Sequence, residues 1–117
     1  MTIGVAGVAT FRSGRIDVGD SLFNTSIGQG AGDAHTTGNA NVAVGYDALT
    51  NNTTGAQNVA VGKGVLTATT TGNYNVAVGS LSLTDNTTGS LNTACGDVAL
   101  YDNTTGGQNT AVGQQAL

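Results

Sequence analysis

The chain has 117 residues, of which 19 are glycine, none is proline or tryptophan and only 9% are charged, and its formal net charge is −4. Abundant glycine, asparagine and threonine disfavour helices, and the low charge without proline is unlike a disordered chain, so the composition predicts β-structure with many turns. The three basic residues (Arg12, Arg15 and Lys63) form no stripe that could follow a phosphate backbone, which argues against nucleic acid as a partner.

The amino-terminal segment, residues 1–23, differs from the rest of the chain. No basic residue precedes its short apolar run, MTIGVAGVATFR, which glycines interrupt, so it does not resemble a signal peptide. No stretch of the chain approaches the roughly 18 apolar residues of a membrane span. We expect a protein made in the cytosol without membrane insertion. A fragment of a longer exported chain would show the same sequence features. We also expect 1–23 to be a divergent repeat that caps the stack or attaches it to another structure.

From residue 24 to residue 117 the sequence repeats every 17 residues without an insertion. An asparagine stands four residues before a glycine in each of six copies, and a Thr-Thr-Gly triplet and a leucine recur in the same phase. The unit reads N-[TV]-A-V-G-x-x-A-L-x-x-N-T-T-G-x-x. A constant period of this length predicts an all-β fold, a parallel β-solenoid with one repeat in each turn. Within a turn, 41–45 and 46–50 are expected to be extended, with glycines at the corners.

The recurring asparagine is predicted to form a buried ladder. A buried amide can bond to backbone at a corner and to the equivalent amide one turn away, as stacked asparagines do. The predicted ladder consists of Asn24, Asn41, Asn58, Asn75, Asn92 and Asn109.

The V-A-V segment predicts a contact between chains. Side chains alternate along a strand, so we expect Val42 and Val44 to fill the interior and Ala43 to lie outside. The same alternation would turn Cys95 inward. A column of small residues on an outer face favours close packing by another chain, with a homotrimer as the natural closed form, unless alanine is merely tolerated there. The predicted interface consists of Ala43, Ala60, Ala77, Ala94 and Ala111.

The segments NTSIGQGAG, NVAVGYDAL and NTAVGQQAL resemble repeats of phage tail fibres and virion appendages. They are also similar to the left-handed β-roll repeats of trimeric autotransporter adhesin heads, whose period is shorter. The resemblance covers about residues 24–117 and implies a trimeric β-roll in a virion, with a structural or host-attachment role. The adhesins' signal peptide, coiled-coil stalk and membrane anchor are missing, which favours a phage fibre assembled in the host cytoplasm. Implied partners are further copies, other virion proteins and a host-surface receptor; a bacterial surface adhesin head fragment is the alternative.

The sequence contains no constellation typical of catalysis or of metal binding. A single histidine, His35, and a single cysteine, Cys95, lack the number and spacing of a zinc site, and no base is placed beside Cys95. Asp85 and Asp102 share a column and should be neighbours between turns, which we interpret as two solvated carboxylates rather than a cation site. We therefore predict a non-enzymatic chain without metal or cofactor.

The variable positions indicate where a binding surface would lie. Residues after each corner glycine and after each leucine change in size and charge, and the candidates there are Tyr46, Lys63, Asp97 and Tyr101. Ice binding is a weaker alternative, because ice-binding solenoids usually place threonines as T-x-T on one face, whereas adjacent threonines point to opposite faces.

The last repeat stops in phase at Leu117. A solenoid end exposes unpaired strand edges, which invite further pairing. Either the chain continues beyond Leu117 or another molecule covers this end. We expect end-to-end stacking into a fibre or docking of a tip or adaptor protein, and the alternative is a solvated, frayed last turn.

Overall fold

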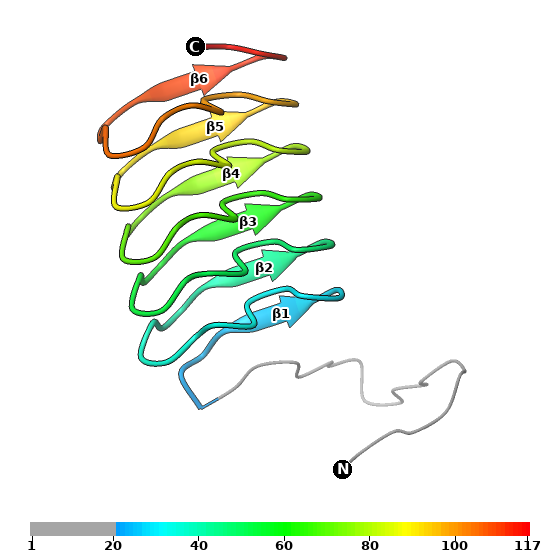
Figure 1. Ribbon diagram of the computed structural model, residues 1–117, viewed down its shortest axis with the longest axis vertical. Helices are drawn as coiled ribbons and strands as arrows, with labels where there is room; N and C mark the ends of the chain where they lie inside the picture. The colour runs from blue at the N-terminus through cyan, green and yellow to red at the C-terminus, as the bar shows by residue number, and fades with distance from the viewer. Residues whose placement is uncertain (1–20) are drawn as a thin grey trace, which may run out of the picture.

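The computed structural model describes residues 21–117, and this part of the chain is a parallel β-solenoid (Figure 1). Its strands form one sheet in the order β1-β2-β3-β4-β5-β6, so each strand pairs with its neighbours in the sequence. The predicted all-β solenoid is confirmed. No helix in the described residues could span a membrane. The strands are β1 (Thr25–Ile27), β2 (Val42–Val44), β3 (Val59–Val61), β4 (Val76–Val78), β5 (Thr93–Cys95) and β6 (Thr110–Val112).

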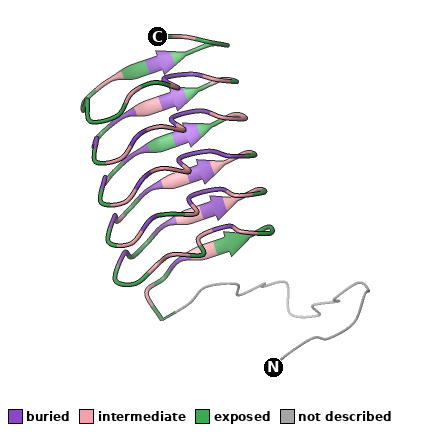
Figure 2. Ribbon diagram, viewed as in Figure 1, coloured by how far each residue is buried: buried purple, intermediate pink, exposed green. Residues whose placement is uncertain are grey.

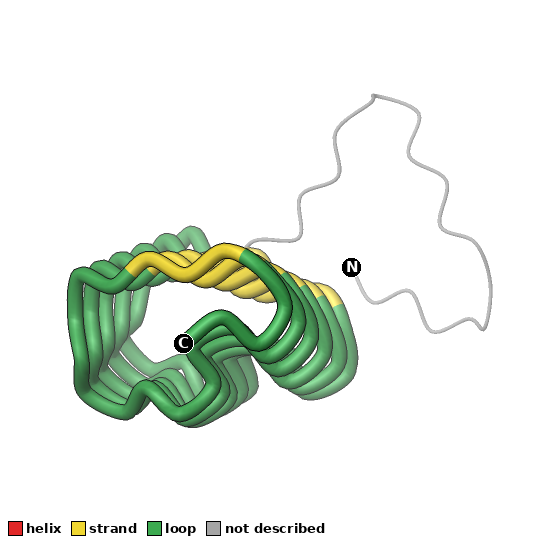
Figure 3. The backbone as a smooth tube through the Cα atoms, turned by 90° about the horizontal axis from the view of Figure 1, so that it is seen from above, coloured by secondary structure: helices red, strands yellow, loops and turns green. Residues whose placement is uncertain are grey.

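Each turn of the solenoid is one 17-residue repeat. The strand pairs are parallel and join residues 17 positions apart, as in Ala43 with Ala60 and Cys95 with Val112. Seen from above, the turns therefore lie almost on top of one another (Figure 3). Because the register never shifts, each position of the repeat becomes a continuous column along the axis. The predicted capping role of 1–23 falls almost wholly on residues 1–20, which lie outside the described part.

The prediction that residues 46–50 are extended is wrong. Asp47 and Leu49 have φ angles of 52° and 53°, in the left-handed region, and their segment is a series of turns. These turns reverse the chain so that Leu49 is fully buried. The corner before them is held by Gly45 (φ 135°), where a Cβ would collide with the carbonyl oxygen of Gly62. Glycine is therefore required at this corner for both conformation and space.

The inside and outside of the strands are opposite to the sequence prediction. Ala43 is fully buried, as are its counterparts in β3 to β5, whereas Val76 and Val78 are 40% and 39% exposed. Figure 2 shows this buried residue within each strand from β2 to β6. The physical reason is the asparagine that precedes the strand. Asn41 is fully buried, so alternation places Ala43 inside with it and turns Val42 and Val44 outward.

The predicted trimer interface is therefore wrong in its location. Ala43, Ala60, Ala77 and Ala94 are fully buried and Ala111 is 3% exposed within a single chain, so no second chain can reach them. Cys95, predicted to point inward, is exposed. Copies of the chain can associate only through another face.

Replacing Ala77 or its neighbour Val78 by threonine tests which of the two side chains points into the interior. Ala77→Thr adds volume and a hydroxyl to a filled interior, and we expect it to lower the free energy of unfolding by about 2–4 kcal/mol. Val78→Thr places its hydroxyl in solvent and should change the free energy of unfolding by about 0.5 kcal/mol or less. Urea denaturation followed by circular dichroism measures both. The reverse order of stabilities would place Val78 inside and contradict the orientation.

Candidate functional site

The predicted asparagine ladder is present inside the solenoid. From Asn41 onward, each asparagine donates its backbone N–H to the Oδ1 of the asparagine one turn earlier, at 2.8–3.0 Å. In several steps its Nδ2 reaches the same oxygen at 3.1 Å. From Asn24 to Asn92, the Nδ2 also donates to the carbonyl of the glycine 14 residues later, at 2.8–2.9 Å. One side chain thus ties the start of the strand to the Thr-Thr-Gly corner and to the neighbouring turn.

A second column of amides, which the sequence analysis missed, lies beside the Thr-Thr-Gly corner. Asn52, Asn86 and Asn103 donate their Nδ2 to the corner glycine of their own turn at 2.8–3.0 Å. Asn103 also donates to the Oδ1 of Asn86 at 3.0 Å, which makes a ladder step. Thr69 interrupts this column, and among the described residues the buried Oδ1 of Asn52 has no hydrogen-bond partner. The signal for the column is the recurring asparagine of N-T-T-G.

The two threonines of each Thr-Thr-Gly triplet have different surroundings. The first donates its hydroxyl to the backbone carbonyl of its counterpart one turn later, as Thr53 does to Thr70 at 3.1 Å. The same bond recurs at Thr36, Thr70 and Thr87. The second threonine is exposed in every turn, as at Thr88. The triplets therefore present a single column of exposed hydroxyls, whereas a T-x-T array presents two.

The predicted binding positions fall into two groups. Tyr46, Lys63 and Asp97 are exposed and share one column, directly after the corner glycines. Tyr101 is half-buried and belongs to a different column, after the leucines. The four residues therefore do not form one surface, and the first three remain as an exposed column of mixed charge.

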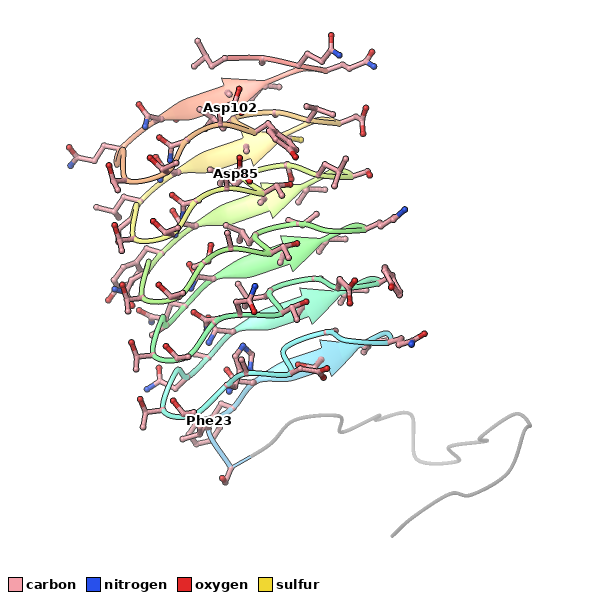
Figure 4. All side chains as sticks on the ribbon, in the orientation of Figure 1. Phe23, Asp85 and Asp102 are labelled. Carbon is pink, nitrogen blue, oxygen red and sulfur yellow. The ribbon has the colours of Figure 1, made fainter. Side chains whose placement is uncertain are left out.

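His35 and Cys95 lie far from each other along the axis, whereas Asp85 and Asp102 are neighbours between turns. Asp85 and Asp102 occupy the same position in successive turns (Figure 4), and Asp85 N–H donates to the carbonyl of Tyr101 at 3.1 Å. Within the described residues, no group of three or more histidine, cysteine or acidic side chains could hold a metal ion. His35 lies in the column of Asn52, in the first described turn, and Cys95 lies on the outside of β5.

An uncharged surface covers the outside of the sheet, and we call it the outer sheet face. It consists of the three columns that begin at Phe23, Thr25 and Ile27 and recur every 17 residues. Among the described residues, it contains all the exposed large hydrophobic side chains except Tyr46 and Leu117. Hydrophobic alternation alone places the valines inside, so the sequence gives no sign of this face.

Comparison with known proteins assigns no family to this chain. Neither protein-family models, nor curated proteins, nor solved structures give a match.

The ladder predicts a large difference between two asparagine substitutions. Asn75→Ala removes the acceptor of the buried Asn92 N–H and leaves a void, and should lower the free energy of unfolding by about 2–4 kcal/mol. Asn51→Ala, on the exposed surface, removes one bond to the carbonyl of Thr67 that water can replace, and should cost about 0.5 kcal/mol. Urea denaturation of both variants gives the comparison. Equal losses would contradict a stabilising ladder.

The gap in the second amide column predicts a difference between two substitutions of Thr69. Thr69→Asn loses the hydroxyl bond to Asn86 but supplies an Nδ2 donor next to the unpaired Oδ1 of Asn52, as Asn103 does for Asn86, and its free energy of unfolding should be about 1 kcal/mol above that of Thr69→Val. Thr69→Val is the control, because it removes the hydroxyl bond to the carbonyl of Asn86 and adds no donor. It should be less stable than the wild type. Thermal unfolding that ranks Thr69→Asn no higher than Thr69→Val would refute the ladder step.

Proposed function

We propose that this chain is a non-enzymatic structural element, the shaft of a phage tail fibre or virion appendage that takes part in host attachment. The single observation that carries the proposal is the identity of successive turns. Each turn holds the next through the same asparagine and threonine bonds, so the structure lengthens simply by adding repeats. A shaft needs this property. The resemblance of the N-x-A-V-G and N-T-T-G repeats to virion appendage repeats supports the same role.

The placement of the reactive side chains supports a non-enzymatic role. A cysteine nucleophile needs a base within hydrogen-bond reach. His35 and Cys95 lie in the first and fifth described turns, and turns about 4.8 Å apart separate them by roughly 19 Å along the axis. The asparagines of the two amide columns are engaged in hydrogen bonds to neighbouring turns or to the corner glycine, and Thr36, Thr53, Thr70 and Thr87 each bond to the next turn. We therefore propose no catalytic residues and no cofactor.

The proposal includes further copies of the chain, other virion proteins and a host-surface receptor as partners. A homotrimer in the virion, assembled in the host cytoplasm, is the form that the resemblance implies. The narrow interior supports association, because alanines and asparagines fill much of it and bury little apolar area against the entropy of ordering. A bacterial surface adhesin is the alternative location. End-to-end stacking into a fibre stays a prediction.

Ice binding is the second candidate, favoured by the exposed threonine column that recurs once in each turn. It differs from adhesion in what it predicts for the purified chain. An ice-binding solenoid lowers the freezing point without changing the melting point, whereas an adhesive shaft binds cells. Thermal hysteresis of a dilute solution therefore separates the two.

Cell binding is the expected outcome for an attachment shaft. A fluorescent fusion of the chain should bind saturably to some strains of a bacterial panel and show no thermal hysteresis. Replacing Tyr46, Lys63 and Asp97 together by serine should weaken binding about tenfold, because these exposed side chains offer the varied contacts. Thr88→Ser, in the other exposed column, is the control and should leave binding unchanged. Hysteresis without binding to any strain would favour the ice-binding candidate instead.

A further inference from the structure

No acidic or basic residue lies on the outer sheet face. Its columns contain Phe, Ala, Gln, Tyr, Leu, Thr, Ile, Val and Cys, and none of these side chains is charged at neutral pH. Surfaces that face only solvent usually carry interspersed charges of both signs. The acidic and basic residues of the described part lie on other columns, and they are Asp33, Asp47, Lys63, Asp85, Asp97 and Asp102.

The largest group of exposed apolar side chains on this face lies in the fourth and fifth described turns, while Gln57, Gln108 and Thr110 are exposed polar residues of the same columns. Tyr74, Val76 and Val78 are 56%, 40% and 39% exposed and follow one another along one turn. Leu91, one turn after Tyr74, is 53% exposed, and Cys95 lies one turn after Val78. Phe23, labelled in Figure 4, occupies the position of Tyr74 in the first described turn, with Ala40 and Gln57 at this position in the two turns between them. The column that begins at Ile27 has an apolar side chain or the Cys95 thiol in every described turn.

The area of the face suits an association of moderate strength. Strands about 4.8 Å apart and residues about 3.3 Å apart give a face of roughly 25 by 15 Å, or about 400 Å². Apolar patches of about 300–600 Å² on soluble proteins are often functional. A partner in a standard interface contributes about 800 Å², so this face alone predicts a concentration-dependent complex rather than a permanent one. Every added repeat would enlarge the face by the area that one existing repeat contributes.

The spacing of side chains on the outer sheet face indicates which partner can pack on it. Two outward side chains in each strand form ridges that repeat about every 4.8 Å along the axis. A partner that contacts all the turns at once needs the same repeat over the same length, and a second copy of this chain has it. Two sheets can then pack face to face about 10 Å apart, with side chains interdigitated as in other sheet packings. We propose that the outer sheet face is a self-association surface on which a second copy of this chain packs.

This inference stands on the exposed face and does not depend on the proposed virion role. It replaces the alanine column as the contact surface between copies, and face-to-face packing joins two copies, unlike the homotrimer that the resemblance implies. A chain that associates without binding cells would support it while removing the attachment function. A monomer that binds cells would support the attachment function and contradict self-association.

Sedimentation equilibrium of three forms of the full chain at about 0.5 mM tests the proposal. The wild type should have an average mass above the 11.5 kDa of one chain, and Val76→Lys should return it to 11.5 kDa, because it places a charge at the centre of the face. Thr88→Lys adds the same charge in the same turn on another face and should keep the wild-type mass. A monomeric wild type, or Val76→Lys with the wild-type mass, would overturn the proposal.

The reactivity of Cys95 gives a second measurement that needs no variant. The thiol lies on the outer sheet face and is exposed in the single chain, so a bulky maleimide should label it quickly in dilute protein. At about 0.5 mM, packing of a second copy should slow the labelling about tenfold. The comparison stays informative if Val76→Lys fails to fold. Equal labelling rates at both concentrations would contradict a covered face.

Discussion

The buried asparagine amide is the interaction on which this solenoid depends. An amide side chain offers an oxygen acceptor and two N–H donors, and leaving such groups unpaired away from water costs about 1–3 kcal/mol each. In every interior turn the Oδ1 accepts the backbone N–H of the next asparagine, and the Nδ2 reaches the Thr-Thr-Gly corner. An insertion would separate these partners, so the ladder accounts for the constant 17-residue step.

The ladder also decides which side of the strand faces solvent. Asn41 and Ala43 lie on the same side of β2, and burial of the asparagine carries the alanine inside with it. Valines that a hydrophobic pattern would place in the core then become the outer surface. A side chain that stabilises the interior thus indirectly creates the apolar surface of the molecule, through nothing more than the alternation of a strand.

The columns of the repeat have different structural roles. Asparagine and threonine columns join successive turns, alanine and leucine columns fill the interior, and the outer sheet face is uncharged over its whole length. The column of Tyr46, Lys63 and Asp97 changes from turn to turn. Because this column does not contribute to the asparagine and threonine bonds, its residues can vary without disturbing the bonds between turns.

The sequence by itself determined the period, the parallel solenoid, the asparagine ladder and the exposure of Tyr46, Lys63 and Asp97. These follow from one-dimensional repetition, since an uninterrupted 17-residue step stacks every residue on its counterpart. Only the tertiary structure decided that Ala43 lies inside and Val42 and Val44 outside, that 46–50 turns through left-handed residues, and that Asn52 heads a second amide column. Repetition leaves the phase of a strand open, because hydrophobicity favours burial of valine and hydrogen bonding favours burial of asparagine. The closed turn settles this competition, because its narrow interior accepts alanine beside the ladder and supplies each amide with partners.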